Sequence, residues 1–207
     1  MENYARLMFT QAVQDLQEAE GTKLKYETFY PHRTQQTLSE DDIAFIKQRN
    51  SFYIASVNSD GWPYVQHRGG ARGFVHVAGP TQIACADYLG NKQFISMGNL
   101  QHDPRVSIFF MDYLNRRRLK VQGKATLIEA KDADDALLAQ LDQRAAPAER
   151  VLQLDIVAMD WNCPKYIPTQ IPEDMIEQIF GPEIQKLRSE NEALREEIAR
   201  LTENQDK

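Results

Sequence analysis

The sequence predicts an α+β protein that is mainly β: a small antiparallel barrel with flanking helices and a coiled-coil helix near its C-terminal end. Residues 52–57 and 105–111 have the composition of strands that are apolar on both faces. Antiparallel sheets normally leave one face to water. We therefore expect one face to line a barrel interior and the other to meet a helix or a second subunit of a homodimer. The third observation is a shift from residue 183 onward to Glu, Arg, Leu and Ala.

Composition narrows the function classes. The chain has 207 residues, 42% hydrophobic and 26% charged, which fits one sizeable core with a small appendage. A net charge of −6 argues against nucleic-acid binding through a basic surface. No apolar run approaches the ~18 residues that a membrane span needs. The first residues lack the apolar core of a signal peptide, so we expect a cytoplasmic protein.

Cysteine and histidine positions give no sign of a metal site. Cys85 lies within an apolar strand pattern, which is typical of a buried structural thiol. Cys163 precedes Pro164 in a loop and is expected to be exposed. Neither cysteine has a partner at metal-ligand spacing, and the four histidines are scattered.

The N-terminal segment is predicted to be helical. Apolar residues recur at helical spacing over residues 5–20, and Gly21 ends that pattern. Residues 22–38 look irregular. Ser39 is a favourable N-cap for a second helix with three acidic residues in its first turn, ending near Asn50.

A block of strands follows, interrupted by short helices. Asp60-Gly61 supplies the positive φ angles of a tight hairpin between the first two strands. The expected strands cover residues 52–57, 62–68, 74–78, 82–86, 105–111, 119–129 and 150–159, and the expected helices cover residues 92–98 and 132–143. After residue 160 the chain is expected to form a linker, a short helix over residues 173–180, and a separate helix from residue 183.

Cations gather where one of these strands ends. The strand finishes at Asp87, the chain turns through Leu89-Gly90, and a helix is expected with Asn91 as N-cap and Lys92 in its first turn. A helix N-terminus attracts anions, and Lys92 adds a full charge. Arg68 and residues 116–118 could add more, which suggests a phosphate-bearing cofactor. Such turns are common, however, and residues 116–118 are equally compatible with a solvated hairpin tip.

Three short motifs at this corner resemble the pyridoxamine 5'-phosphate oxidase superfamily, the flavin-binding split β-barrels. They are Gly90-Asn91-Lys92-Gln93, His102-Asp103-Pro104-Arg105-Val106-Ser107 and Gly123-Lys124-Ala125. The resemblance covers roughly residues 40–165 and looks more like the uncharacterised flavin-nucleotide-binding branch. It implies a split barrel, FMN as cofactor, and a small-molecule substrate or electron donor. The expected segments are 1–38 (helical), 39–165 (FMN-binding barrel), 166–182 (linker and short helix) and 183–207 (coiled-coil helix).

The resemblance also implies which residues hold the cofactor. Lys92 matches a phosphate-contacting arginine, and Gln93 matches a lysine, a lost charge for which Arg68 could compensate. The residues implied at the cofactor are Val65, Gln66, His67, Arg68, Ala86, Asp87, Asn91, Lys92, Gln93, Arg118 and Trp161. Arg118 replaces a flavin-contacting glutamine, where a cation could stabilise negative charge on the reduced ring. Trp161 lies near a flavin-packing tryptophan of the family, although a plain core tryptophan fits equally well.

One departure from the family concerns the substrate. True pyridoxamine phosphate oxidases carry an Arg-x-His pair after that tryptophan, and residues 162–168 contain none. We expect a flavin-dependent oxidoreductase of unknown substrate, in which the flavin carries the redox chemistry and no protein nucleophile is needed. The alternative is a non-catalytic flavin carrier, redox sensor or interaction module, and a deazaflavin or haem binder on the same fold also stays open.

The C-terminal segment has a seven-residue repeat. Ile184, Asn191 and Ile198 occupy one position, and Leu187, Leu194 and Leu201 occupy another. Ile at a and Leu at d favour a parallel two-stranded coiled coil, and one buried Asn at a fixes its register. The alternative is an amphipathic helix that packs on its own barrel.

Overall fold

The computed structural model describes residues 1–142, 146–161 and 164–205. Cys163, expected to be exposed, lies outside them. The chain divides into two compact units, and each is described by itself. The first contains Met1–Asp112 and Arg116–Tyr166, and the second contains Tyr113–Asn115 and Ile167–Lys207.

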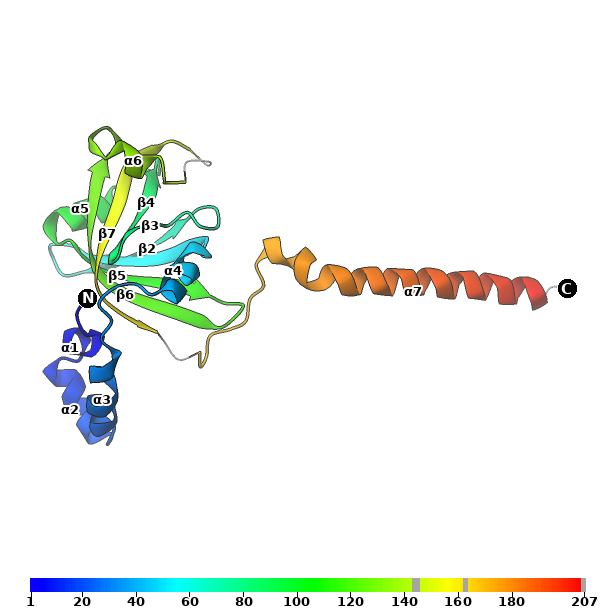
Figure 1. Cartoon of the computed structure of the whole chain (residues 1–207), viewed down its shortest axis with the longest axis horizontal. Helices are drawn as coiled ribbons and strands as arrows, with labels where there is room; N and C mark the ends of the chain where they lie inside the picture. Colours follow the sequence, from blue (N-terminus) through cyan, green and yellow to red (C-terminus); the bar gives the residue numbers. More distant parts are fainter. Residues whose placement is uncertain (143–145, 162–163, 206–207) are drawn as a thin grey trace. The chain divides into compact units, whose positions relative to one another are not determined.

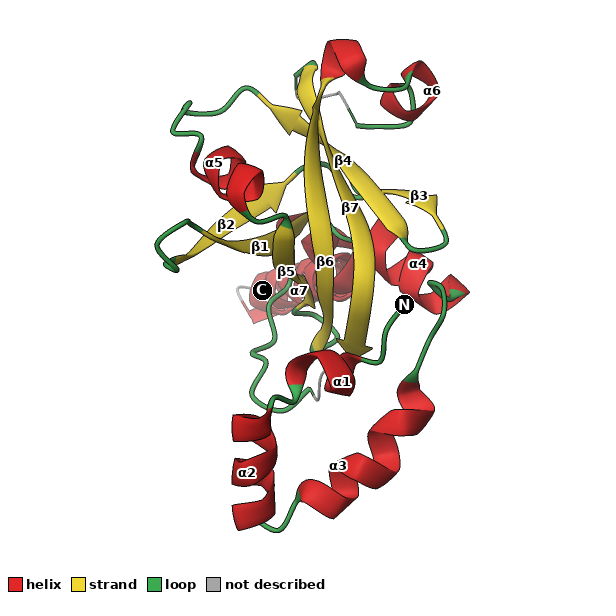
Figure 2. Cartoon of the chain, turned by 90° about the vertical axis from the view of Figure 1, so that its left-hand side faces the viewer, coloured by secondary structure: helices red, strands yellow, loops and turns green. Residues whose placement is uncertain are grey.

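One antiparallel sheet of seven strands, counted over the described residues, forms the body of the first unit (Figures 1 and 2). Its strands are β1 (Ser51–Val57), β2 (Pro63–Gly69), β3 (His76–Gly79), β4 (Gln82–Tyr88), β5 (Arg105–Asp112), β6 (Arg117–Glu129) and β7 (Ala148–Trp161). Their order is β2-β1-β5-β6-β7-β4-β3. The predicted mainly β, α+β fold with a split barrel is confirmed.

The main core lies on one face of this sheet. Phe110, Leu119 and Val121 are completely buried there, together with Ile46 from the preceding helix. On β1 the burial alternates, because Phe52 and Ile54 point into the core while Tyr53 and Val57 stay 38% and 39% exposed. The face of β1 opposite the core is therefore partly exposed within one chain, and the contact of that face with a second subunit stays a prediction.

The helices of the first unit flank the sheet. They are α1 (Tyr4–Met8), α2 (Gln11–Ala19), α3 (Lys23–Phe29), η1 (Tyr30–Arg33), α4 (Glu40–Lys47), α5 (Ile95–His102), η2 (Ala130–Asp132) and α6 (Asp135–Leu138). The helix expected over residues 5–20 is two helices, and the segment 22–38 expected to be irregular contains α3 and η1. The break after Met8 places the Phe9 ring 5.6 Å from Tyr26 and 5.1 Å from Tyr30.

The predicted start of α4 is confirmed. Ser39 and Asp42 form a reciprocal capping box. Asp42 Oδ1 also accepts a 2.9 Å hydrogen bond from Trp161 Nε1, and the Trp161 ring packs edge-on against Phe45 at 4.6 Å. These contacts join α4 to the end of β7.

Two later helices differ from expectation. α5 begins at Ile95, not at residue 92, because Lys92 and Phe94 have φ angles of +59° and +55°, outside the right-handed helical region. Asn91 is therefore not the N-cap. The helix expected over residues 132–143 is limited to the short η2 and α6, and Asp134 caps α6.

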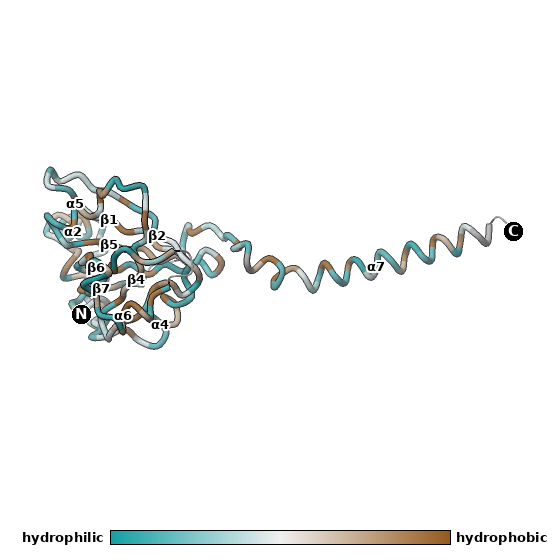
Figure 3. Tube along the Cα trace, turned by 90° about the horizontal axis from the view of Figure 1, so that it is seen from above, coloured by the Kyte–Doolittle hydropathy of each residue, from teal (hydrophilic) through white to brown (hydrophobic). Residues whose placement is uncertain are grey.

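The second unit consists mainly of η3 (Glu173–Met175) and α7 (Ile176–Gln205). The short helix and the separate helix expected here are one continuous helix, with Pro182 inside it. Proline has no N–H to donate, so one hydrogen bond of the helix is lost there, yet α7 continues through Pro182. Brown apolar segments recur among teal ones along α7 (Figure 3). Within the described residues, no helix is long and apolar enough to cross a membrane.

Candidate functional site

An ion-pair cluster connects three strands at one edge of the core. Asp87 of β4 accepts hydrogen bonds from Arg68 of β2 and, at 2.8 Å, from Nε of Arg150 of β7. The side chains of these three residues are 7%, 17% and 12% exposed. Arg150 is directly opposite Asp87 in the β4–β7 register, whereas Arg68 reaches Asp87 from the far edge of the sheet.

A hollow of about 110 Å³ opens beside this cluster. It lies between β2, the end of β4 and the start of α5. Its lining is Tyr64, Gln66, Arg68, Asp87, Tyr88, Gly90, Asn91, Lys92, Gln93, Phe94, Ile95, Ser96, Met97, Glu149 and Arg150.

The wall formed by residues 91–97 is shaped by its backbone. Lys92 and Phe94 adopt left-handed conformations, and Asn91 Oδ1 accepts a 3.2 Å hydrogen bond from the Gln93 backbone. Ser96 Oγ then donates a 2.8 Å hydrogen bond to Gln66 Oε1, which ties α5 to β2. The first N–H groups of a helix have no intrahelical partner, and the Phe94 side chain cannot cap them. Because Ile95, Ser96 and Met97 line the hollow, the start of α5 lies at its wall.

The hollow carries a net positive charge. Arg68, Lys92 and Arg150 contribute three positive charges, and Asp87 and Glu149 contribute two negative ones. Burial alone would lower the pKa of Arg150, but the hydrogen bond and charge of Asp87 outweigh it and raise that pKa. Nε of Arg68 is buried and has no hydrogen-bond partner in the part of the chain that the structure describes. The arrangement suits a small anionic group.

Six of the predicted cofactor residues line this hollow. They are Gln66, Arg68, Asp87, Asn91, Lys92 and Gln93. Lys92 therefore lies at the hollow although α5 starts later than expected.

The other five predicted residues lie elsewhere. Val65 and His67 are on the opposite face of β2, where His67 stacks edge-on against Tyr53 at 5.5 Å. The guanidinium of Arg118, on the same face as His67, lies 4.9 Å above the Phe109 ring.

Ala86 and Trp161 complete that set. Ala86 is buried in a second apolar cluster with Leu141 and Val151. Trp161 contacts α4 through Phe45 and Asp42, as described above.

Arg150 is the main residue that sequence reasoning missed. Its place depends on the register that sets it opposite Asp87, and that register is not visible in the spacing of the chain. Ser96 was not among the predicted residues either, because its hydrogen bond to Gln66 depends on how α5 packs against β2. Among the described residues, no group of three or more His, Cys, Asp or Glu side chains is placed to hold a metal ion.

A larger hollow, of about 590 Å³, lies among the N-terminal helices. Its lining mixes apolar and aromatic side chains with polar ones, and the cationic side chains of Arg6 and Lys23 are matched there by Glu2 and Glu27. The smaller hollow, whose side chains carry an excess of positive charge beside the start of α5, fits an anion better.

Comparison with known proteins identifies the family. A family model described as pyridoxamine 5'-phosphate oxidase matches residues 39–162. No curated protein matches the chain. Similar solved structures include a candidate pyridoxamine 5'-phosphate oxidase from Lactobacillus delbrueckii, 23% identical with a TM-score of 0.48, covering 62% of this chain and 97% of that one. Another is an FMN-binding protein from Syntrophomonas wolfei, 13% identical with a TM-score of 0.43, covering 72% and 97%. Since the family model spans more than half of its residues, the chain belongs to the pyridoxamine 5'-phosphate oxidase family.

Proposed function

We propose that this protein binds FMN, with the phosphate in the hollow beside Arg68, Asp87 and Arg150. The observation that carries the proposal is the convergence of Arg68, Lys92 and Arg150 with the uncapped start of α5. Arginine and backbone N–H groups are the usual partners of a phosphate.

The size of the hollow supports a site completed by a second copy of the chain. Ligand sites usually have ~300–1,000 Å³, so a hollow of about 110 Å³ has room for the phosphate end alone. The face of β1 and β2 opposite the core exposes Tyr53, Val57 and Val65 at 38%, 39% and 62%. Burying such a patch favours association. We infer a homodimer in which this face, together with His67 on β2 and Arg118 on the same side of β6, contacts the ring of the cofactor bound to the partner.

The proposed activity is that of an oxidoreductase acting on a small molecule. When bound, FMN supplies the electron transfer. Arg68, Lys92 and Arg150 hold the phosphate and thereby fix the position of the ring. Arg118 would place positive charge near the ring.

A non-catalytic role is the second candidate, favoured by the exposed apolar stripe of α7. Ile184, Leu187, Leu194, Ile198 and Leu201 are each 43% to 62% exposed. A stripe of this kind is typical of interaction with another helix. The protein could then carry flavin or sense its redox state as part of an assembly.

Titration of FMN into the flavin-free protein tests the cofactor assignment. Binding should quench flavin fluorescence and give bound flavin absorbance that stays with the protein through gel filtration. Absence of bound flavin at saturating FMN rules the assignment out. If FMN binds, steady-state turnover with candidate donors and acceptors separates an oxidoreductase from a carrier or sensor.

A further inference from the structure

α7 presents an apolar stripe, interrupted by Asn191, over its last three heptads. With Ile184, Asn191 and Ile198 at position a and Leu187, Leu194 and Leu201 at position d, the stripe recurs at the 3.5-residue spacing of a coiled coil. The structure adds that these positions belong to one unbroken helix that runs to Gln205. Most of the stability of helices in proteins comes from packing of an amphipathic face, so an exposed stripe of this regularity calls for a partner.

Asn191 identifies the kind of partner. In the single chain its Nδ2 donates a 3.3 Å hydrogen bond to the Leu187 carbonyl of its own helix, leaving the amide oxygen available. An Asn at position a lowers the stability of an otherwise apolar coiled-coil interface. In a parallel two-stranded coiled coil it pairs with the same Asn of the second helix and so fixes the register. Ile at the other a positions and Leu at every d position favour two strands as well.

The charges beside the stripe agree with a second copy of this chain. Glu183 and Glu190 occupy position g, and Arg188 and Arg195 occupy position e five residues later. In a parallel pair each g residue faces the following e residue of the partner helix, so both Glu residues meet an Arg. An identical helix therefore satisfies the stripe, the Asn and the charges together.

We propose that α7 pairs with α7 of a second copy in a parallel, in-register, two-stranded coiled coil over residues 183–201. Three heptads alone are short, and a dimer of the barrel would raise the effective concentration of the two helices. The proposal rests on the proposed homodimer for this higher effective concentration, and it does not rest on FMN binding.

Disulfide cross-linking of single-cysteine variants of the full chain tests the register. In a Cys163→Ser background, Ile184→Cys, Asn191→Cys and Ile198→Cys each place a thiol on the seam, and Ser189→Cys places one on the opposite face. Cys85 is present in every variant, but it is buried and should not cross-link. Under mild oxidation at low protein concentration, each seam variant should cross-link at least about tenfold faster than Ser189→Cys.

The pattern of linked variants decides the outcome. Rapid linkage at 184, 191 and 198, with slow linkage at 189, supports the parallel pair. Linkage at 191 alone indicates antiparallel helices centred there, and equal linkage at all four indicates random collision, so either result overturns the proposal. Absence of linkage at all seam positions overturns it too. Repeating the assay without FMN keeps a failure here distinct from a failure of the proposed flavin site.

Charge reversal provides an independent test. One chain carries Arg188→Glu and Arg195→Glu, and the other carries Glu183→Arg and Glu190→Arg, each with Asn191→Cys. After co-expression, the share of mixed cross-linked dimers should exceed that of random pairing, because each chain repels its own copy and attracts the other. A random share contradicts the parallel g–e pairing.

Discussion

Arg68 and Asp87 form an ion pair that closes the barrel between strands far apart in the sheet. Arg68 is on β2, the first strand in the sheet order, and Asp87 is on β4, the sixth. No ladder joins these two strands, so the side chains make the connection that the backbone does not. The same pair forms one wall of the hollow proposed for the phosphate. Closure of the barrel and the shape of the site therefore depend on the same contact.

We expect Asp87→Ala to lower the free energy of unfolding by about 3–5 kcal/mol, the range for removing one partner of a buried pair. The variant leaves Arg68 and Arg150 buried without their shared carboxylate. Urea unfolding followed by tryptophan fluorescence measures the change. Asp103→Ala is the control, since Asp103 pairs with the exposed Arg105 and should shift the midpoint little. Equal shifts in the two variants would argue against a structural role for the Arg68–Asp87 pair.

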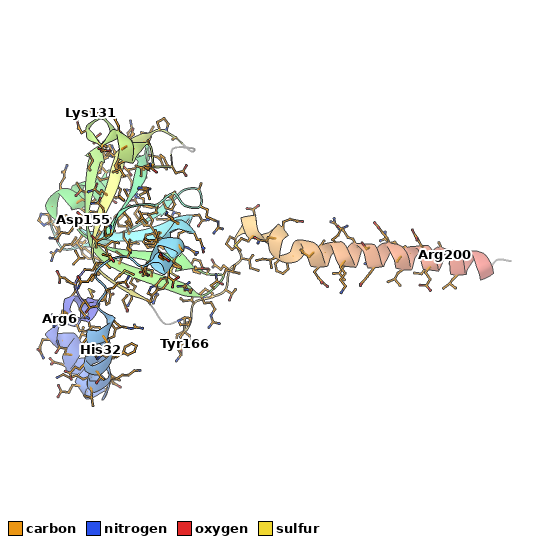
Figure 4. All side chains as sticks on the ribbon, viewed as in Figure 1. Arg6, His32, Lys131, Asp155, Tyr166 and Arg200 are labelled. Atoms are coloured by element: carbon orange, nitrogen blue, oxygen red, sulfur yellow. The ribbon has the colours of Figure 1, made fainter. Side chains whose placement is uncertain are left out.

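Lys92→Ala should weaken FMN binding by about 1–3 kcal/mol, the range for losing a charge-assisted hydrogen bond. Lys92 lines the hollow in a left-handed conformation at its rim. Lys131, labelled in Figure 4 and located in η2, supplies a matched control, because Lys131→Ala removes an equal charge away from the hollow lining. Fluorescence titration compares the two dissociation constants. If both variants bind as the wild type does, the phosphate is held elsewhere.

The barrel itself was predictable because its strands follow alternating or continuous apolar patterns that few other structures satisfy. The start of α5 was not, because the left-handed conformations of Lys92 and Phe94 belong to residues that rarely adopt them. Asn91 and Lys92 looked like the beginning of a helix by local preference alone. The tertiary contact between Ser96 and Gln66 fixes where the helix lies.

The sequence predicted only part of the lining of the hollow, for a similar reason. The sequence predicted the lining residues that lie close to the Leu89-Gly90 turn, whereas Arg150 reaches the hollow through strand register. The alternation of a strand also separates neighbours, so that Gln66 and Arg68 face the hollow while Val65 and His67 face the opposite side. A spacing pattern identifies the strand but not which of its residues contact a ligand in one chain.

Asp42 should make stability fall in acid. Burial alone would raise the pKa of Asp42, but hydrogen bonds from Ser39, Gln35 and Trp161 outweigh it and lower that pKa. A lowered pKa in the folded state gives stability that is present above the unfolded pKa of ~3.9 and is lost as the pH falls through the folded value. We expect Asp42→Asn to lower the free energy of unfolding by about 1–2 kcal/mol at neutral pH.

The difference between wild type and Asp42→Asn should begin to shrink below pH ~4, where the carboxylate of the unfolded chain takes up a proton. It should reach its minimum once the pH has fallen below the lowered pKa of the folded state. Unfolding measured across this pH range, with the exposed neighbour Asp41→Asn as control, checks it. A difference that stays constant down to the lowest pH would mean that the charge of Asp42 contributes nothing.

Cys85 should be unreactive in the folded protein. Burial in the core raises the pKa of its thiol to about 12. The charge of Arg68 lowers this pKa and the charge of Asp87 raises it, both by smaller amounts. The thiolate is the reactive form, so almost none is present at pH ~8. In a Cys163→Ser variant, a disulfide reagent should modify the protein only after denaturant is added. Rapid modification of the native variant would show that the strand opens or that the core is more polar than its packing indicates.

Pyridoxamine 5'-phosphate should be a poor substrate even if the flavin site is complete. Residues 162–168 lack the Arg-x-His pair that resemblance to true oxidases of this family leads one to expect. A substrate phosphate without its charged clamp would be buried unpaired, and losing such a polar contact costs about 10⁴-fold in kcat/KM. Oxidation of pyridoxamine 5'-phosphate by the FMN-loaded protein, measured beside a true oxidase, gives this ratio.

Photoreduction of the bound flavin and its reoxidation in air provide the control, because they show whether the flavin is redox-competent. Turnover within about tenfold of the true oxidase, with a competent flavin, would mean that other residues bind the substrate phosphate in place of the missing pair.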